Sequence, residues 1–378
     1  MREEGWTGMP ELSLAPTLSL LAAFGRTPAL PFQTLWRTTG HRFRPPQVTP
    51  FIPRIRRAQD AVLAGGEIQP AEGVTLTREQ HRGGTPTLVL GGFVPDGPEQ
   101  VYLLRSFLIK QGSLYYAHYP DDGFSSDLIF AQLDDLVTEL ATVHGQPPVI
   151  FAVSFGAGLL LEWLRRMRLA GRTPAVRGII LVSPVACAAD LLVPGEPKPT
   201  TLLGRAIKPY LGSNDRTERG VTEKSRAIFT KMFEAGAQNK EALRGLLTRQ
   251  ELRLLRTTVI GTLQRITSTG ASARVQALLQ LEFPSAYFCP TLLPLTEAPT
   301  LILYAEKEES VLTHLAPSRF ALQTAHCAYF PQSACKTISN PRGSPVQHAS
   351  LIFHCSNFLP PISAFYRGLK KRNALKAA

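Results

Sequence analysis

A serine near the middle of the chain stands where an apolar run gives way to an amphipathic stretch. Residues 148–153 form the apolar run, Ser154 follows it, and residues 155–170 have the spacing of a helix. A sharp turn between strand and helix would expose the serine hydroxyl at the carboxyl end of the strand, beside the free N–H groups of the helix. The small residues Ala152 and Gly156 would let strand and helix approach each other closely. This pattern predicts a nucleophilic serine in acyl-transfer chemistry.

A serine hydroxyl is a poor nucleophile, so this chemistry needs a base and a carboxylate that orients the base. The chain has eight histidines, and those nearest the expected start of the last helix are His348, which follows a Gly-Ser-Pro loop, and His354. Four carboxylates follow predicted strands and are candidates for the acid: Glu306, Glu308, Glu309 and Asp190. Geometry rather than spacing decides such roles, so the residues alone leave this choice open.

The elements that must position these side chains alternate between strands and helices. Continuous apolar runs predict buried strands at 87–90, 113–117, 148–153, 176–182 and 300–304, with a further strand near 327–330. Helical spacing at 126–144 and 155–170 separates three of them, and a last helix is expected from about His348 to Leu369, bent at Pro360 and Pro361. Strands of this kind, separated by helices, indicate a mostly parallel sheet covered on both faces.

The chain is long enough for two domains, or for one large domain with an insertion. Residues 1–60 are rich in proline and arginine, and we expect a basic N-terminal arm that is partly ordered on the body of the protein. Residues 190–296 have helical stretches near 221–234, 239–267 and 272–282 and no strand run, which predicts an all-helical lid insertion. The core would then comprise residues 61–189 and 297–378.

The formal net charge of +12 could attract nucleic acid or an anionic lipid surface. No zinc-finger spacing, helix-turn-helix pattern or aromatic-basic strand signature appears, so we expect no nucleic-acid partner. The arginines of the arm and the basic tail at 370–372 favour at most a weak contact with an anionic membrane. No apolar run reaches the ~18–20 residues of a transmembrane helix, and the acidic start is a poor secretory signal, so we expect a cytoplasmic location.

The string from Ala152 to Gly158 resembles the nucleophile elbow of the α/β-hydrolase family, whose pattern is G-x-S-x-G. Ala152 departs from the first glycine of that pattern, although alanine still fits sterically. The resemblance is to serine esterases and lipases and spans roughly residues 85–370, and the segment from Gly91 to Gly158 is similar to uncharacterised bacterial members. It implies an α/β fold with a mostly parallel sheet, flanking helices and a helical lid.

The resemblance also implies which residues act. The family order of serine, acid and histidine maps the acid onto Glu308, with the other three carboxylates as alternatives, and the base onto His348, with His354 as its rival. The oxyanion would be held by the main-chain amide of Phe155, directly after the serine, and by that of Phe93 in the loop after the first core strand. No metal and no cofactor is expected.

These observations predict a serine hydrolase that cleaves a hydrophobic carboxylic ester, either a small molecule or a lipid, through an acyl-enzyme intermediate. The apolar face of the helical insertion would cover the acyl chain and exclude water from it. A thioesterase, a peptidase and an acyltransferase remain alternatives on the same three side chains, because the fold does not fix the reaction. An alternative from another class is a catalytically silent hydrolase fold that binds a partner or associates with a membrane.

Overall fold

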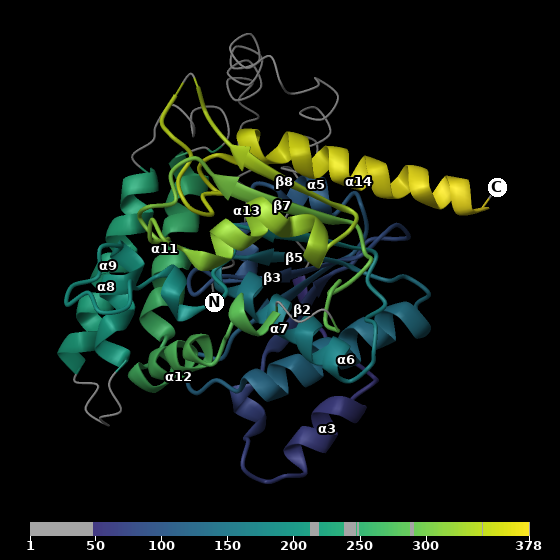
Figure 1. Cartoon of the computed structure of the whole chain (residues 1–378), viewed down its shortest axis with the longest axis horizontal. Helices are drawn as coiled ribbons and strands as arrows, with labels where there is room; N and C mark the ends of the chain where they lie inside the picture. The colour runs from purple at the N-terminus through teal and green to yellow at the C-terminus, as the bar shows by residue number, and fades with distance from the viewer. Residues whose placement is uncertain are drawn as a thin grey trace, which may run out of the picture.

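An eight-stranded sheet runs through the centre of the molecule, with helices packed on both of its faces (Figure 1). The computed structural model describes residues 48–211, 219–237, 247, 249–287, 291–341 and 343–377. The strand order is β1-β2-β4-β3-β5-β6-β7-β8. The pairs β1–β2 and β2–β4 are antiparallel, and all other neighbouring strands are parallel. The predicted sheet, mostly parallel and flanked by helices, is confirmed.

The strands lie close to the positions that the apolar runs predict, with one exception. Their bounds are β1 Val48–Pro50, β2 Thr75–Glu79, β3 Thr87–Leu90, β4 Leu114–His118, β5 Val149–Val153, β6 Gly178–Val182, β7 Thr300–Ala305 and β8 Ser333–Ile338. The strand expected near 327–330 is wrong, because residues 327–329 end a helix and the strand begins at Ser333. Strand β8 is an edge strand whose side chains are half exposed, so it lacks the apolar run that marks a buried strand.

The helices alternate with the core strands up to β6, a group of helices follows between β6 and β7, and the last two come after β7 and after β8. Their bounds are α3 Arg57–Leu63, α4 Gly97–Gln100, α5 Arg105–Leu108, α6 Ser126–Thr142, α7 Phe155–Leu169, α8 Leu202–Ile207, α9 Arg219–Ala237, α11 Arg249–Arg265, α12 Ser268–Leu279, α13 Pro317–Tyr329 and α14 Cys355–Ala377. Short 3₁₀ turns occur at η1 Pro70–Glu72, η2 Ala188–Asp190, η3 Lys208–Tyr210 and η4 Ser285–Tyr287.

The last helix begins later than the sequence predicts. Helix α14 starts at Cys355, seven residues after His348, and it contains Pro360 and Pro361. Ala349 has a φ of 47°, in the left-handed region that no α-helix uses. His348 therefore stands in a loop before the helix and does not open it.

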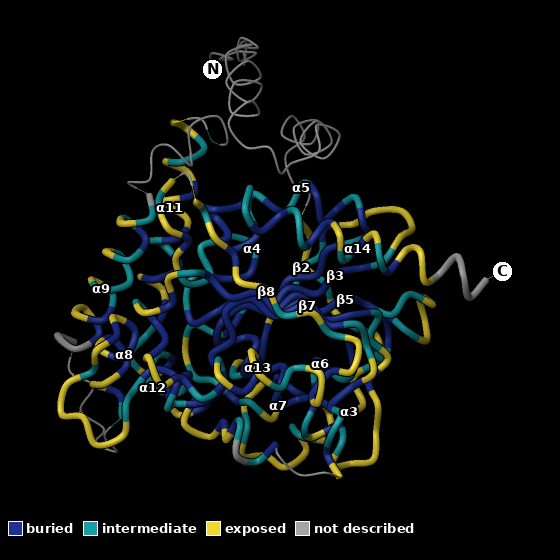
Figure 2. The backbone as a smooth tube through the Cα atoms, turned by 45° about the horizontal axis from the view of Figure 1, so that its top comes forward, coloured by how far each residue is buried: buried dark blue, intermediate teal, exposed yellow. Residues whose placement is uncertain are grey.

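Two apolar clusters pack against the sheet, one on each face, and a smaller third cluster includes Phe233, Val259 and Phe353. Along β5, Ile150 and Ala152 belong to the cluster that includes helices α6, α7 and α13, while Phe151 and Val153 belong to the cluster that includes α5 and α14. This alternation follows from the two-residue period of a strand. The central strands are consequently buried on both faces, as Figure 2 shows in dark blue.

The last residues of the expected N-terminal arm, 48–60, lie against the core. Strand β1 pairs with β2, and the main-chain amides of Ala58 and Gln59 each donate to the Asp135 carboxylate of α6 at 2.9 Å. The main-chain amide of Ile55 donates to Glu139 of the same helix, also at 2.9 Å. The rest of that arm, residues 1–47, lies outside the described residues.

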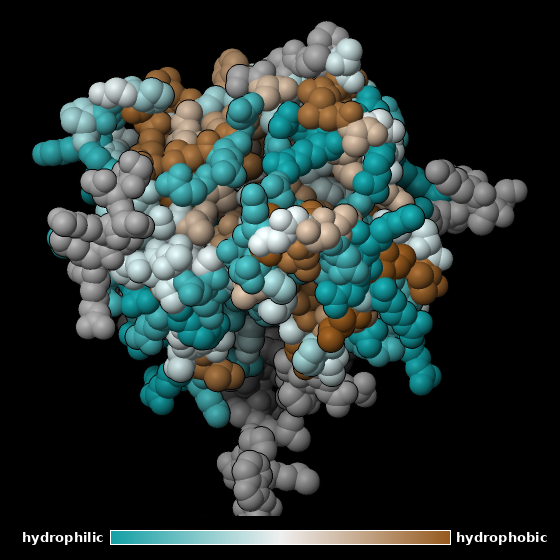
Figure 3. All heavy atoms as spheres, turned by 90° about the horizontal axis from the view of Figure 1, so that it is seen from below, coloured by the Kyte–Doolittle hydropathy of each residue, from teal (hydrophilic) through white to brown (hydrophobic). Residues whose placement is uncertain are grey.

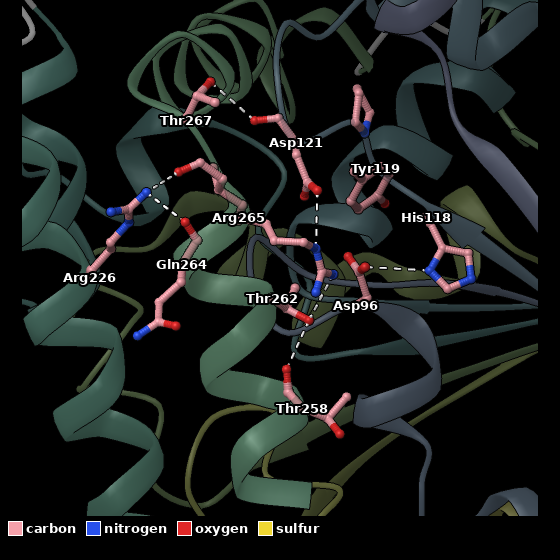
Figure 4. A network of polar contacts seen from close by, with 12 residues as sticks. Asp96, His118, Tyr119, Asp121, Arg226, Thr258, Thr262, Gln264, Arg265 and Thr267 are labelled. Carbon is pink, nitrogen blue, oxygen red and sulfur yellow. Dashed lines mark hydrogen bonds and ion pairs between the residues drawn. The ribbon is translucent and has the colours of Figure 1, made fainter. Parts of the chain in front are cut away.

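Helices α8, α9, α11 and α12 gather at one side of the sheet (Figure 1, left). The end of α11 and the start of α12 are bonded to the loop after β4, as Figure 4 shows. The amide of Thr267 donates to the carbonyl of Asp121 at 2.9 Å, and Arg265 Nε donates to the Asp121 carboxylate at 3.2 Å. Of the helical stretch expected near 239–267, residues 239–246 and 248 lie outside the described residues.

The surface carries apolar residues in separate groups. On the face shown in Figure 3, several brown groups are divided by hydrophilic residues. The most exposed large apolar side chains come from different elements: Ile52, Leu169, Leu254, Leu315 and Phe320. Of the helices in the described part of the chain, none is both long enough and apolar enough to cross a bilayer.

Candidate active site

Ser154 stands at the turn between β5 and α7, as the sequence predicts. Its φ of 51° and ψ of −116° are uncommon for a residue with a side chain, and they mark a strained turn. The Ser154 amide donates to the carbonyl of Val182 on the neighbouring strand at 2.8 Å, which fixes the turn. A Cβ at Gly156 would lie 2.3 Å from the carbonyl oxygen of Gly91, so this position accepts only glycine.

The structure brings His348 to the serine. His348 Nε2 lies 2.9 Å from Ser154 Oγ, and His348 Nδ1 lies 2.5 Å from Glu308 Oε2. A carboxylate can only accept, so Nδ1 carries the proton in this pair and Nε2 is left to accept from the serine hydroxyl. The three side chains form one chain of hydrogen bonds with the polarity that proton transfer from Ser154 requires.

Glu308 is fully buried at the end of β7. Its Oε1 accepts from the amide of Ala305 at 2.6 Å and from Ser183 Oγ at 2.8 Å, while Oε2 faces the histidine. Ser183 Oγ in turn accepts from the amide of Ala349 at 3.1 Å, beside His348. These bonds fix the carboxylate and the histidine loop relative to each other.

The other candidate carboxylates have different partners. Glu306 accepts from the amides of Asn340 and Val346 at 2.9 and 2.8 Å, and so orders the loop that leads to the histidine. Asp190 is buried and accepts from three main-chain amides: Ala186, Cys187 and Ser318. Burial raises the pKa of Asp190 above its ordinary value. Glu309 is exposed at the surface. Glu308 is the carboxylate that bonds His348.

His354, the rival base, is buried in the turn before α14. Its Nδ1 lies 2.8 Å from Ser350 Oγ, and its Nε2 lies 3.2 Å from the carbonyl of Ser344. Burial lowers the pKa of His354 below the ordinary 6.5. The ring is thus held by the loop that carries His348, and His348 is the histidine at the serine.

The expected oxyanion donors flank the serine. Phe155 is the first residue of α7, and Phe93 follows the Gly91–Gly92 pair after β3. The two phenyl rings stack with centroids 4.3 Å apart. Within the described ranges, neither the Phe93 amide nor the Phe155 amide donates to a protein acceptor.

A cavity of about 390 Å³ opens on Ser154 and His348. Its walls are mainly apolar, and helices α9 and α11 supply one side of them with Phe229, Met232, Phe233, Val259 and Leu263. Leu202 and Leu203 of α8 and Ile352 and Phe353 after the histidine also belong to the apolar lining. The polar atoms of the site are concentrated near the serine, so the cavity suits a ligand with one polar and one apolar end.

Three residues at the site were not predicted. Ser183 bonds Glu308, Gln100 lines the cavity, and the buried Arg274 of α12 donates to the carbonyls of Phe93 at 2.7 Å and Pro120 at 3.0 Å. Burial lowers the pKa of Arg274. Ser183 directly follows the fourth core strand, and this position was the signal that could have found it. A glutamine at the end of the four-residue helix α4 and an arginine within α12 carry no such signal.

The described residues contain no cluster that could hold a metal ion. Such a cluster would need three or more histidine, cysteine, aspartate or glutamate side chains.

Comparison with protein-family models and with curated sequences gives no match. Solved structures do match. A thermophilic esterase from Thermogutta terrifontis is 17% identical with a TM-score of 0.50, over 78% of this chain and 94% of its own. An esterase from Exiguobacterium antarcticum is 15% identical with a TM-score of 0.51, over 78% and 96%. A membrane phospholipase A, described as a bacterial virulence factor, is 12% identical with a TM-score of 0.52, over 94% and 97%.

Similarity at sequence identities this low shows a shared fold and does not show a shared reaction. Three observations agree on the fold: the strand order, the strained turn at Ser154 after β5, and the similarity to these solved structures. The chain has the α/β-hydrolase fold.

Proposed function

We propose that this protein is a serine hydrolase that cleaves a hydrophobic carboxylic ester through an acyl-enzyme intermediate. The observation that carries the proposal is the chain of hydrogen bonds from Ser154 through His348 to Glu308, at one end of an apolar cavity. The fold that the chain shares with esterases among the similar structures is compatible with this chemistry. Ser154 is the nucleophile, His348 the base, and Glu308 the residue that orients the imidazole.

In the first half of the reaction, Ser154 Oγ attacks the ester carbonyl carbon while His348 Nε2 takes the hydroxyl proton. Negative charge develops on the carbonyl oxygen, and the amides of Phe155 and Phe93 donate to it. Glu308 stabilises the imidazolium that forms. The intermediate collapses as the bond to the alcohol oxygen breaks, and His348 returns its proton to the leaving alcohol.

In the second half, water replaces the alcohol. His348 Nε2 removes a proton from this water, whose oxygen attacks the acyl carbon of the Ser154 ester. The second oxyanion binds the same two amides, the bond to Ser154 Oγ breaks, and His348 returns the proton to the serine. The products are the carboxylic acid and the free enzyme.

The apolar cavity supports an ester with a hydrocarbon acyl group. Its volume of about 390 Å³ lies within the ~300–1,000 Å³ typical of small-molecule sites. We propose that residues 190–296 act as a lid on a core formed by residues 61–189 and 297–378, because Phe229, Met232 and Leu263 from that segment face the cavity. Burial of each methylene there contributes about 0.8 kcal/mol to binding.

Hydrolysis of p-nitrophenyl esters of graded acyl length tests this function. We expect turnover by the wild type, a rise of kcat/KM with chain length until the cavity is filled, and loss of activity in Ser154→Ala. Ser310→Ala is the matched control, since Ser310 also lines the cavity, and it should remain active. No hydrolysis of any ester by the folded wild type, or undiminished turnover by Ser154→Ala, would contradict the proposal.

A further inference from the structure

Gln100 ends helix α4 beside the serine turn, in the wall of the cavity. We propose that its side-chain amide is a third donor to the oxyanion, in addition to the main-chain amides of Phe155 and Phe93. This inference rests on the proposed function and adds a catalytic residue to it. The residue is 6% exposed, so the hydrogen bonds of its polar side chain must be accounted for.

One end of the Gln100 amide has a partner that fixes its orientation. Gln100 Oε1 accepts from the main-chain N–H of Gly92 at 3.0 Å. A main-chain N–H can only donate, so the side chain must present its oxygen to Gly92 and its NH₂ group to the opposite side. The orientation of the Gln100 amide therefore follows from the donor at Gly92, which requires an oxygen opposite it.

The NH₂ group lies next to the nucleophile. A Cβ built on Gly92 would stand 3.1 Å from Gln100 Nε2, 3.3 Å from Ser154 Cβ and 3.8 Å from Ser154 Oγ. Gln100 Nε2 and Ser154 Oγ thus both border the space that a side chain at Gly92 would occupy. Gly92 also directly precedes Phe93, so this space adjoins the loop that supplies the second expected oxyanion donor.

Gln100 Nε2 has no acceptor among the residues that the structure describes, and it is not one of the fully buried polar atoms without a partner. Since Gln100 lines the cavity, this N–H group is open to an acceptor that a ligand brings there. A carbonyl oxygen gains negative charge when Ser154 attacks, and a hydrogen bond to a charged acceptor is stronger than one to a neutral acceptor. The amide would therefore stabilise the transition state more than the bound ester, which raises kcat.

A positioning role is the other reading of this residue. In that role, Gln100 would use only its Oε1, which holds Gly92 and the loop that carries Phe93. The two roles use different ends of the amide. Gln100→Glu keeps an oxygen for the Gly92 N–H and removes the donor, whereas Gln100→Met removes both ends without adding charge.

The experiment measures p-nitrophenyl ester hydrolysis at pH 8.5, where the introduced carboxylate is ionised, and binding of an alkyl trifluoromethyl ketone that forms a charged hemiketal with Ser154. We expect both variants to lose ~10²–10³-fold in kcat with little change in KM. The ketone affinity of the uncharged Gln100→Met should fall by a similar factor. Gln111→Met is the matched control, since Gln111 is a buried glutamine outside the cavity lining, and it should behave as the wild type.

Near-wild-type kcat in Gln100→Glu would overturn the proposal, because it would reduce Gln100 to a support for Gly92. Unchanged kcat and ketone affinity in Gln100→Met would overturn it as well. Circular dichroism and thermal melting establish that each variant is folded. Absence of hydrolysis by the wild type would instead overturn the proposed function, and the role of Gln100 with it, so the two failures are distinguishable.

Discussion

His348 Nε2 lies 2.9 Å from Ser154 Oγ, although 194 positions separate the two residues in the sequence. Parallel strands explain the meeting, because their carboxyl ends share one edge of the sheet. Ser154 follows β5, Glu308 follows β7, and the loop with His348 follows β8. The fold thus gathers a nucleophile, a carboxylate and an imidazole from three distant segments at one edge.

Replacing Glu308 by glutamine is expected to lower kcat by about 10⁴-fold. The amide can donate to His348 Nδ1, which would leave Nε2 protonated and unable to accept from Ser154. Steady-state kinetics on a p-nitrophenyl ester measures the effect. Glu309→Gln alters an exposed carboxylate of the same segment and should keep wild-type activity. Equal kcat values for the two variants would contradict the role of Glu308.

Replacing Gly92 by alanine is expected to lower kcat by up to about 10²-fold, because a small displacement of the reacting groups suffices for such a loss. The new methyl group would stand 3.1 Å from Gln100 Nε2 and 3.3 Å from Ser154 Cβ. Gly368→Ala in α14 is the control, since its methyl group would meet no atom within 4 Å. Full activity in Gly92→Ala would show that the space beside the serine is not used.

Replacing Arg274 by methionine is expected to lower both stability and activity. The carbonyls of Phe93 and Pro120 would lose their donors, at a cost of about 1–3 kcal/mol in the free energy of unfolding. The loop that carries Phe93 would also lose its tether to α12, so kcat should fall. Urea unfolding and ester kinetics measure the two effects.

The control for this variant is Arg256→Met, which removes an exposed arginine of α11 paired with Glu234. A surface ion pair contributes about 0–1 kcal/mol, so its loss should change little. If both arginine variants unfold at the same urea concentration and turn over at the same rate, the tether has no role.

Acid should destabilise the protein in part through His354. Burial holds the pKa of His354 below the ordinary 6.5, so the unfolded chain takes up its proton first as the pH falls. The contribution of His354 to stability is present above pH 6.5 and is lost as the pH falls through the folded-state pKa. Urea unfolding at pH 7.5 and 5.0 should therefore show a smaller loss of stability in His354→Gln than in the wild type. Equal losses would refute this assignment.

The sequence predicts the central strands and the serine turn well, because buried parallel strands are continuous apolar runs and the nucleophile turn has a local pattern. Strand β8 was misplaced, since Ser333, Lys336 and Thr337 on an exposed edge produce no such run. The helix expected at His348 begins later because Ala349 adopts a left-handed backbone conformation. The residue type alanine does not predict that conformation.

The residues that support the site could not be predicted from spacing. Ser183 meets Glu308 across 125 positions, and Arg274 meets Phe93 across 181. Such contacts depend on which distant segments the fold brings together, and a local sequence pattern does not predict that. Gln100 and Gly92 are only eight residues apart. A glutamine at the end of a short helix can have many functions, however, and only the orientation of its amide in the structure points to a role at the site.

Covalent labelling with an alkyl fluorophosphonate tests the central claim most directly, because the reagent reacts with a serine only when its hydroxyl is activated. Mass spectrometry of the labelled wild type should find one adduct, on Ser154, and Ser154→Ala and His348→Gln should remain unlabelled while Ser310→Ala is labelled at the wild-type rate. A folded wild type that resists the reagent, or a Ser154→Ala variant that is labelled as fast as the wild type, would contradict the account.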